Sequence, residues 1–357
     1  MSNEHGTSTR QLISGNEAAG EAAIRAGCRF YAGYPITPQN ELIAYMADQL
    51  PLRGGQFVQA ESELAAVNMI FGASAAGARC MTSSSSPGIS LKQEGISYLA
   101  ACNLPAVIIN VQRGGPGLGG IGPSQGDYFQ TTRGGGHGDY RCIALAPASV
   151  QEMADLTYKA FDLADKYRNP VIVLSDAMTG QMMEGADLEH LPEPHPPEKP
   201  WALTGARGRE KNVLRSLYFK EGQLTDHNLE LQRKYETIRE AEARCEMLNC
   251  EEAQILIVAY GSSARIAREL VLHPPDDLPA EVGLLRPITL WPFPYEDLTA
   301  ALQKVEAVLT VEMSAGQLVE DVRLASQGRR PVHLLARPGE GVFTVEQIKN
   351  KIISVLD

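Results

Sequence analysis

Residues 28–38 read Cys-Arg-Phe-Tyr-Ala-Gly-Tyr-Pro-Ile-Thr-Pro, a short β-favouring run that stops at two prolines on either side of Ile36 and Thr37. Proline fixes its own φ and disfavours the helical conformation in the residue before it. Ile36 and Thr37 are therefore expected to be extended, with the threonine hydroxyl at the end of a strand. Ligands of open α/β sheets bind beyond the carboxyl ends of strands. The segment is a candidate binding loop, and a plain strand-to-helix turn is the competing interpretation.

Alternating β-like and helix-like segments extend outward from this stretch. The strands expected in this first block are 30–34, 56–59, 79–82, 106–111, 141–146 and 171–175, and the helices are 15–26, 63–77, 89–103 and 149–167. The last helix opens with Ser149 and Glu152 at capping-box spacing. Nearly continuous apolar strands joined by helices predict a parallel sheet covered on both faces.

A second block of the same kind begins near residue 253, with strands expected at 254–259, 281–285, 307–311 and 332–336. Between the blocks, residues 188–212 have the Pro-rich, charged composition of a linker. A charged helix is expected over 226–250, with Leu229, Leu231, Tyr235 and Ile238 as candidate contacts. Covering a domain is the favoured interpretation, and contact with a partner is the alternative. The predicted class is α/β, with two three-layer domains built on mainly parallel sheets. Their expected bounds are 1–187 and 251–357, with the linker and helix at 188–250.

Composition narrows the class of protein. A chain of 357 residues exceeds the usual size of a single core. The net charge of −11 argues against binding to nucleic acid or to an anionic membrane. The chain begins with polar residues, and no apolar run approaches the ~20 residues of a membrane span. We expect a cytoplasmic protein with residues 1–9 disordered.

The six cysteines are scattered along the chain and form no Cys-x-x-Cys motif. Free, mostly buried thiols are expected, because the chain has no secretion signal. An iron–sulfur cluster needs several neighbouring thiolates, so no cluster of its own is predicted for this chain. His137, in the glycine-rich stretch 132–140, has no second ligand at zinc-like spacing. We therefore predict no metal site.

Two polar motifs follow expected strands and open helices. Glu61-Ser62-Glu63 places carboxylates at a helix start, where they are favourable against the helix dipole. Helix capping competes here with a buried carboxylate tuned for proton transfer. The run Thr82-Ser-Ser-Ser-Ser-Pro-Gly88 offers hydroxyls and free N–H groups to an anionic or carbonyl group, and hydroxyls that only cap the helix are the alternative. It contains no Gly-x-Ser-x-Gly elbow, which excludes a serine hydrolase of that type.

A glycine-rich loop follows the expected strand 106–111. It contains a literal Gly117-x-Gly119-x-x-Gly122. No helical pattern opens on this motif, as the dinucleotide-binding mechanism requires, so an NAD(P) oxidoreductase is the weakest interpretation. A loop with Arg113 at its base is favoured instead. Arg113 is a candidate clamp for a carboxylate, with a surface ion pair as the alternative.

Together these motifs resemble the α subunit of 2-oxoacid:ferredoxin oxidoreductases, over nearly the whole chain. The segments that carry the resemblance are Tyr-Pro-Ile-Thr-Pro at 34–38, Ala-Glu-Ser-Glu-Leu at 60–64, the serine-rich loop and helix at 82–95, Gln-Arg-Gly-Gly-Pro-Gly-Leu-Gly at 112–119, Gly-Gly-Gly-His-Gly-Asp-Tyr at 134–140, Leu-Ala-Pro-Ala-Ser-Val-Gln-Glu-Met at 145–153 and Glu-Met-Ser-Ala-Gly-Gln-Leu-Val-Glu-Asp at 312–321.

The resemblance implies a thiamine-diphosphate enzyme that decarboxylates a 2-oxoacid, forms an acyl-CoA from coenzyme A, and passes electrons to ferredoxin. It implies that this subunit carries a pyrimidine-binding domain and a transketolase-C-terminal-like domain. A β subunit would supply the diphosphate–magnesium site. The iron–sulfur clusters would lie in partner subunits only, with γ or ferredoxin-like subunits completing a heteromer. The sequence agrees, since it contains no Gly-Asp-Gly motif of the kind that opens a diphosphate site.

The resemblance also assigns roles to residues. Glu63 matches the catalytic glutamate that hydrogen-bonds the aminopyrimidine ring and favours its imino tautomer. Thr37 and Arg113 match residues that hold the substrate carboxylate. The remaining residues expected to line the cofactor are Tyr34, Pro35, Ile36, Ser85 and Ser86.

The loops after Arg113 look most like the 2-oxoisovalerate (3-methyl-2-oxobutanoate) branch of that family. The 2-oxoglutarate branch typically has Gly-Pro-Ser-Thr-Gly where this chain has Gly-Pro-Gly-Leu-Gly at 115–119. The same chemistry on 2-oxoglutarate, giving succinyl-CoA, is the alternative. A non-catalytic assembly subunit is the alternative from a different class of function.

Overall fold

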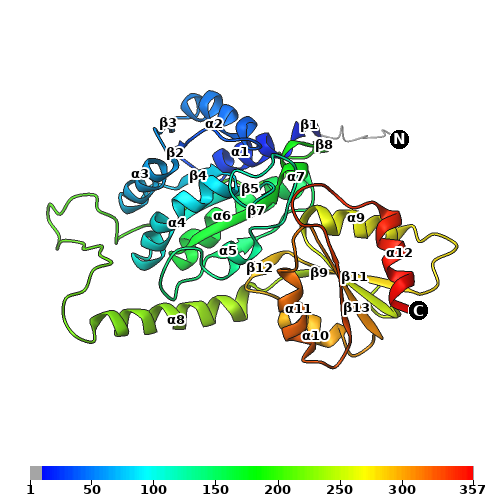
Figure 1. Ribbon diagram of the computed structural model, residues 1–357. Coiled ribbons are helices and arrows are strands. Elements are labelled where there is room, and N and C mark those ends of the chain that lie inside the picture. Colours follow the sequence, from blue (N-terminus) through cyan, green and yellow to red (C-terminus); the bar gives the residue numbers. More distant parts are fainter. Residues whose placement is uncertain (1–9, 357) are drawn as a thin grey trace, which may run out of the picture.

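The computed structural model describes residues 10–356, so the expectation for residues 1–9 lies outside the described residues. Two sheets, each between layers of helices, account for most of the chain (Figure 1). The predicted α/β class with mainly parallel sheets is confirmed. No helix in the described part of the chain is long and apolar enough to cross a membrane.

The larger sheet has seven strands in the order β12-β6-β7-β5-β4-β2-β3, and all neighbours are parallel except β12 against β6. Its strands are β2 (Phe30–Gly33), β3 (Gln56–Gln59), β4 (Cys80–Ser84), β5 (Ala106–Gln112), β6 (Ile143–Leu145), β7 (Pro170–Asp176) and β12 (Thr289–Trp291). The central strands β4, β5 and β7 are buried along their whole length, as their continuous apolar runs predicted.

Helices cover both faces of this sheet (Figure 1). Helices α1 (Gly15–Arg25) and α6 (Val150–Tyr167) pack together on one face, and α3 (Glu63–Ala75) and α4 (Ser86–Ala101) pack together on the other. Helix α2 (Asn40–Leu52), which was not predicted, packs against α1. The elements completing this part are α5 (Tyr128–Thr132), α7 (Ala177–Gln181) and the antiparallel pair β1 (Gln11–Ser14) and β8 (Met183–Ala186).

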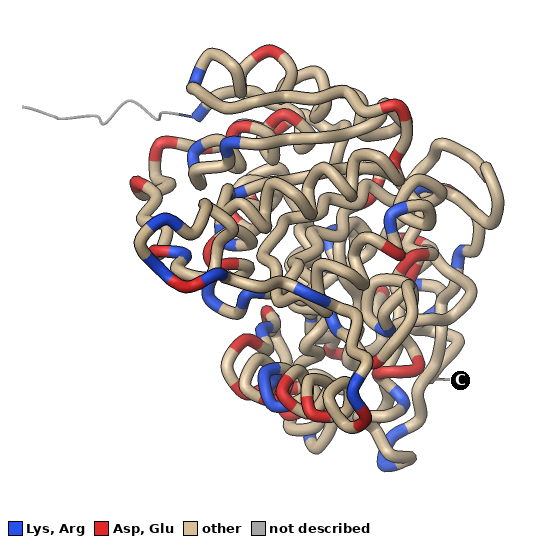
Figure 2. Tube along the Cα trace, turned by 90° about the vertical axis from the view of Figure 1, so that its left-hand side faces the viewer, with Lys and Arg blue, Asp and Glu red and all other residues tan. Residues whose placement is uncertain are grey.

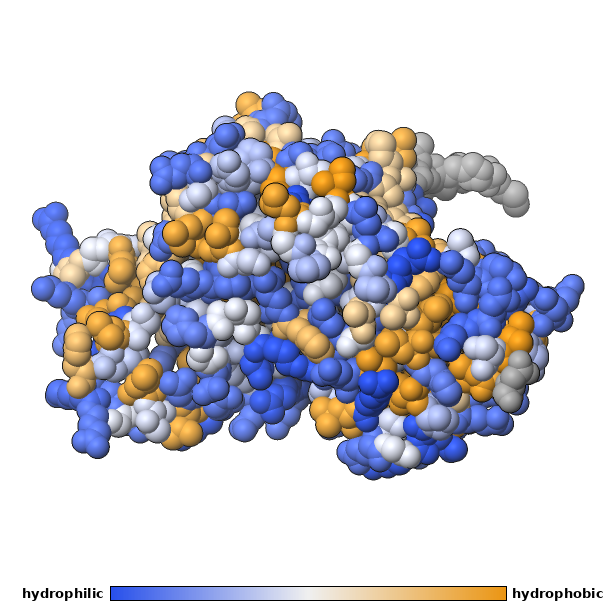
Figure 3. Space-filling model, viewed as in Figure 1, coloured by the Kyte–Doolittle hydropathy of each residue, from blue (hydrophilic) through white to orange (hydrophobic). Residues whose placement is uncertain are grey.

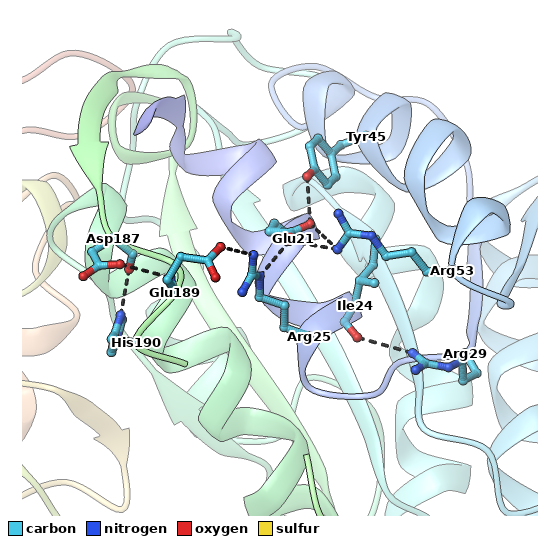
Figure 4. A network of polar contacts seen from close by, with 9 residues as sticks. All are labelled: Glu21, Ile24, Arg25, Arg29, Tyr45, Arg53, Asp187, Glu189 and His190. Atoms are coloured by element: carbon cyan, nitrogen blue, oxygen red, sulfur yellow. Dashed lines mark hydrogen bonds and ion pairs between the residues drawn. The ribbon is translucent and has the colours of Figure 1, made fainter. Parts of the chain in front are cut away.

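A buried carboxylate joins α1 to the end of α2 (Figure 4). Glu21 in α1 accepts hydrogen bonds from Arg25, Arg53 and the Tyr45 hydroxyl. Burial raises the pKa of Glu21, but the hydrogen bonds from Arg53, Arg25 and Tyr45 outweigh it, and the net shift is downward. Arg25 continues the network to Glu189, which lies beyond β8.

The smaller sheet has the order β14-β13-β10-β11-β9, with β9 antiparallel to β11. Its strands are β9 (Cys245–Leu248), β10 (Ile255–Val258), β11 (Val282–Pro287), β13 (Ala307–Glu312) and β14 (Val332–Ala336). Its helices are α9 (Gly261–Leu272) and α12 (Val345–Leu356), which pack together, and α10 (Tyr295–Ala301) and α11 (Leu318–Ser326), which form a second pair.

Between the sheets, residues 187–222 form no helix or strand, in line with the linker composition. Helix α8 (Gln223–Glu242) follows, with residues of both signs close together along it (Figure 2). Leu231, Tyr235 and Ile238 are buried against the first core as predicted. Leu229 is half exposed, so it does not pack against this core. The helix ends eight residues earlier than predicted, because residues 245–248 form β9 instead.

The capping box predicted for α6 is half correct. The Ser149 hydroxyl accepts the hydrogen bond of the Glu152 N–H at 3.1 Å. The Glu152 carboxylate accepts from the Ala148 N–H and from both terminal nitrogens of Arg286 instead of turning back to Ser149. Arg286 lies in β11 and also binds Glu246 of β9, so this guanidinium joins helix α6 to the smaller sheet. All six cysteines are free, as expected, and only Cys245 is not buried.

Candidate functional site

The connections of the seven-stranded sheet reverse direction between β2 and β4. The chain runs from β2 through α2 to β3 on one side, and then returns through α3 to β4 on the other side of β2. At such a point the segments beyond the carboxyl ends of the strands diverge and leave a crevice, which is the usual ligand site of this architecture. The segments after β2, β3, β4 and β5 carry every site residue predicted from the sequence.

Glu63 is the first residue of α3, and it is buried, with 6% of its surface exposed. The helix is capped by Ser62, whose hydroxyl accepts the Ala65 N–H, so Glu63 is not needed as the cap. Its carboxylate faces α4: a Cβ on Gly88 would lie 2.6 Å from Glu63 Oε1. Among the described residues no hydrogen bond to the carboxylate oxygens of Glu63 is found. The arrangement therefore favours the buried-carboxylate interpretation over helix capping.

Lys92 in α4 lies beside Glu63 and was not predicted as a site residue. Its side chain is fully buried, and its ammonium donates to Thr82 Oγ1 at 3.0 Å and to the Glu63 carbonyl at 3.4 Å. Burial lowers the pKa of Lys92 to about 8, against the opposing effect of the Glu63 charge. The sequence feature that could have indicated Lys92 is its position one helical turn after Gly88, in a helix rich in small and apolar residues.

The loop after β2 brings Thr37 to Arg113. Thr37 and Pro38 form a turn with a cis peptide bond between them. The Thr37 carbonyl accepts from Arg113 Nη1 at 2.9 Å, and its hydroxyl accepts from Asn40 Nδ2 at 3.1 Å. Tyr34 and Pro35, the first residues of the loop, are exposed, and Ile36 and Thr37 are partly buried.

Arg113 follows β5 and is 9% exposed. Its second terminal nitrogen donates to the Leu118 carbonyl at 3.0 Å, so the guanidinium closes the base of the glycine-rich loop. Nε of Arg113 is buried without a hydrogen-bond partner among the described residues. Buried donors are nearly always paired in folded proteins. This nitrogen is therefore available to a ligand in the crevice.

The serines between β4 and α4 divide into two kinds. The hydroxyls of Ser84 and Ser85 are buried and have no partner in the part of the chain that the structure describes. The Ser86 hydroxyl is engaged, since it donates to Asp127 Oδ2 at 2.7 Å and accepts from the Arg113 N–H at 3.1 Å. Burial raises the pKa of Asp127, although hydrogen bonds from Ser86 and Asn110 oppose the shift. Of the two serines predicted to line the cofactor, Ser85 thus has a free hydroxyl and Ser86 does not.

The glycine-rich loop does not have the geometry of a dinucleotide-binding turn. No helix begins at Gly122, and the next helix, α5, starts at Tyr128. The Gly122 N–H donates to the Glu340 carboxylate at 2.9 Å, so this N–H of the motif is already bound by a residue from the segment after β14. A Cβ on Gly119 would lie 1.7 Å from the Gly114 carbonyl oxygen, at a φ of 57°, which explains the glycine there.

The contacts of His137 are with residues of α4. Its carbonyl accepts from the Ser97 hydroxyl at 3.0 Å, and its ring packs edge-on against Tyr98. Within residues 10–356 there is no group of three or more His, Cys, Asp or Glu side chains arranged to hold a metal ion.

Apolar side chains are exposed next to the crevice. Leu64 and Met69 of α3 and Leu91 of α4 are each more than one third exposed. Apolar surface gathers over these two helices on the face shown in Figure 3. Exposed apolar surface of this kind is typical of a contact with another protein.

Two family descriptions match the chain. Residues 21–249 match "Pyruvate flavodoxin/ferredoxin oxidoreductase, thiamine diP-bdg", and residues 253–348 match "Pyruvate:ferredoxin oxidoreductase core domain II".

The curated relatives are similar over nearly their whole length. Ketoisovalerate oxidoreductase subunit VorB of Methanothermobacter marburgensis is 50% identical over 96% of this chain and 97% of its own. 2-oxoglutarate synthase subunit KorA of Archaeoglobus fulgidus is 42% identical over 87% of this chain and 90% of its own.

Among solved structures, the 2-oxoglutarate:ferredoxin oxidoreductase from Magnetococcus marinus, with 2-oxoglutarate, coenzyme A and succinyl-CoA bound, superposes with a TM-score of 0.86 at 27% identity. The match covers 98% of this chain and 66% of that chain.

Proposed function

This chain belongs to the pyruvate flavodoxin/ferredoxin oxidoreductase family, and from that premise we propose that it is the α-type subunit of a thiamine-diphosphate-dependent 2-oxoacid:ferredoxin oxidoreductase. Its substrate is 3-methyl-2-oxobutanoate, which the complex converts with coenzyme A to an acyl-CoA and CO2 while reducing ferredoxin. The 50% identity to a ketoisovalerate oxidoreductase subunit, against 42% to a 2-oxoglutarate synthase subunit, supports the branched-chain substrate. The Gly-Leu-Gly sequence at 117–119 supports it too.

The observation that carries the proposal is the set of unpaired polar groups at the reversal point of the sheet. The hydroxyls of Ser84 and Ser85 and Nε of Arg113 are buried there without partners among the described residues. Glu63 lies beside them as a buried residue with 6% of its surface exposed. A heteroaromatic ring with a basic nitrogen and an amino group satisfies a carboxylate and hydroxyls, and a substrate carboxylate satisfies an arginine. The residues present therefore fit the pyrimidine end of thiamine diphosphate together with a 2-oxoacid.

Each residue has a role that follows from its chemistry. When bound, thiamine diphosphate supplies the stabilised carbanion chemistry that decarboxylation of a 2-oxoacid requires. Glu63 holds a shared proton at a ring nitrogen of the pyrimidine. Arg113 binds the carboxylate of the substrate, and Thr37, whose carbonyl already holds Arg113, contributes its hydroxyl on the same side. Tyr34, Pro35 and Ile36 form the wall of the crevice on the β2 side.

Half of this site must come from outside the chain. We assign the diphosphate and its Mg²⁺ to a β subunit, and the iron–sulfur clusters to this and other partner subunits, γ or ferredoxin-like. The exposed apolar surface over α3 and α4, next to Glu63, supports a partner at that position. Coenzyme A and ferredoxin enter as co-substrate and electron acceptor of the assembled complex.

The first test is dye reduction by the complex purified through this chain. With coenzyme A present, a low-potential viologen is expected to be reduced faster with 2-oxoisovalerate than with 2-oxoglutarate. Faster reduction with 2-oxoglutarate would support the same type of reaction but would identify 2-oxoglutarate as the substrate.

A substitution separates a catalytic subunit from a non-catalytic assembly subunit. Glu63→Gln is nearly isosteric and is expected to reduce turnover by about a hundredfold or more, the usual contribution of a positioned acid–base group. Glu61→Gln is the matched control, because Glu61 is exposed two residues away. Equal turnover of Glu63→Gln and wild type, with the subunits still co-purifying, would leave only the assembly role.

A further inference from the structure

The glycine-rich loop, residues 113–122, has few side-chain contacts that could fix its shape. A Cβ on Gly115 or Gly117 would have no atom within 4 Å, and the Leu118 side chain is 81% exposed. Even so, the Leu118 carbonyl has a definite place, because it accepts from Arg113 Nη2 at 3.0 Å. A contact from outside the loop is needed to keep it there.

Glu340, from the segment between β14 and α12, provides that contact. Its carboxylate accepts from the Gly122 N–H at 2.9 Å. A Cβ on Gly120 would lie 2.0 Å from Glu340 Oε2, so the carboxylate rests directly on the Gly120 backbone. Beside it, the Gly341 N–H donates to the Pro123 carbonyl at 3.0 Å. No ion pair of Glu340 is found in the described part of the chain, so this carboxylate serves the loop.

The loop carries this contact back to Arg113. The Gly114 N–H donates to the Gly122 carbonyl at 3.2 Å, and the Gly120 N–H donates to the Gly114 carbonyl at 3.0 Å. These two bonds join the residues that Glu340 holds to the residue that directly follows Arg113. A single carboxylate from the unit of the smaller sheet therefore fixes the loop that begins at the arginine.

We propose that Glu340 is a positioning residue, which holds the glycine-rich loop, and through it the Arg113 guanidinium, in the geometry that binds the carboxylate of the 2-oxoacid. The inference rests on the proposed function and deepens it, since it adds a residue from the smaller-sheet unit to the substrate site. Hydrogen bonds weaken steeply away from their preferred distance and angle. A loosened loop keeps Arg113 but spreads its orientations, so substrate affinity falls more than the rate of the chemical step.

Hydrogen exchange of the purified complex tests the contact without depending on any activity. Mass spectrometry follows the peptides that cover residues 113–122. In Glu340→Ala the loop is expected to exchange ~3–10-fold faster, because the Gly122 N–H loses its acceptor. Glu340→Gln is expected to keep the wild-type rate, because its amide oxygen can accept from the same N–H. Glu346→Ala is the matched control, since Glu346 is also exposed but pairs with Lys349 in its own helix.

Dye reduction by the same complexes tests the effect on substrate binding. In Glu340→Ala, KM for the 2-oxoacid is expected to rise ~3–10-fold while kcat changes by less than about twofold, and Glu340→Gln is expected to restore KM.

Gly120→Ala reaches the same contact from the side of the loop. Gly120 does not have a positive φ, and the three atoms nearest to an added Cβ all belong to Glu340. The substitution therefore displaces the carboxylate without straining the loop, and it is expected to raise KM as Glu340→Ala does. In the double variant the clash is gone, so its KM is expected to equal that of Glu340→Ala alone, whereas independent effects would multiply.

Several results would overturn the inference. They are a wild-type exchange rate in Glu340→Ala, faster exchange with an unchanged KM, multiplied effects in the double variant, and an equal rise of KM in Glu346→Ala. The proposed function fails in a different way. A wild-type complex that contains no thiamine, measured as thiochrome, overturns that function and with it the substrate role of Glu340, whereas the exchange rates still decide whether Glu340 holds the loop.

Discussion

Replacing Gly88 by alanine tests the packing that holds Glu63. A Cβ there would lie 2.1 Å from Ser84 Oγ and 2.6 Å from Glu63 Oε1, whereas ordinary contacts are 3.4–4 Å. Both side chains must move by about 1 Å, and overpacking of this kind typically costs ~1–3 kcal/mol. Alanine regains about 0.5–1 kcal/mol over glycine within a helix. The net loss of stability is therefore about 1 kcal/mol, but a 1 Å displacement of a catalytic group can reduce turnover by ~100-fold.

Two glycines on the same pair of helices provide controls. A Cβ added to Gly72 in α3 would have no atom within 4 Å, so Gly72→Ala is expected to stabilise the chain slightly and leave turnover unchanged. A Cβ on Gly95 in α4 would clash with Val67 at 2.5 Å, seven residues further along the helix from Gly88. Gly95→Ala is expected to destabilise the chain about as much as Gly88→Ala does, without the large loss of turnover.

The assays are urea unfolding for stability, thiochrome for bound thiamine, and dye reduction by the complex for turnover. Wild-type turnover in Gly88→Ala would refute the argument that the Glu63 carboxylate is held against α4. An equal loss of turnover in Gly95→Ala would attribute the effect to a general shift of the two helices.

Two further predictions concern charged groups. The lysine of Arg113→Lys can reach only one of the Thr37 and Leu118 carbonyls that Arg113 joins. Since charge-assisted hydrogen bonds are worth ~1.5–3 kcal/mol, KM for the 2-oxoacid is expected to rise ~10–100-fold, with a smaller change in kcat. An unchanged KM would contradict the role of Arg113 in binding the substrate carboxylate. Glu21 has a pKa below its ordinary value of 4.5, so its charged form stabilises the folded chain above that pH, and the contribution disappears as the pH falls through the lowered value. Glu21→Gln should lower the free energy of unfolding by ~1–3 kcal/mol at pH 7 and by progressively less below about pH 4 in urea titrations, and a pH-independent difference would rule out a charge effect.

The parallel strands were predictable because their signal is local. Each is a short apolar run between helix-like segments, and the predicted ranges agree closely with β2–β5, β7, β10, β11, β13 and β14. Strand β12 has only three residues, and it pairs with β6 far earlier in the chain. Nothing within Thr289–Trp291 indicates which sheet they join. Strand β9 was predicted as helix because charged residues precede it, and its pairing with β11 decides its conformation.

The candidate site was predictable in part, because its polar residues directly follow the ends of predicted strands. The parallel topology brings those strand ends together at one edge of the sheet. Strands β2, β3, β4 and β5 share one carboxyl edge, so Thr37, Glu63 and Arg113 gather there. Their roles in the reaction remain predictions. The Arg113–Thr37 contact, the packing of Glu63 against Gly88 and the buried Lys92 depend on side-chain direction between distant elements, which no local pattern encodes.

The position of strand β12 in the chain also affects the order in which the two sheets can be completed during synthesis. Strand β12, the seventh strand of the larger sheet, is synthesised after strands β9, β10 and β11 of the smaller sheet. Until Thr289–Trp291 leave the ribosome, β6 is an unprotected sheet edge able to pair with another nascent chain. A chain truncated before residue 289 retains that edge permanently. Chaperone engagement should therefore persist until residues 289–291 have been synthesised, and the two sheets should melt as one cooperative unit.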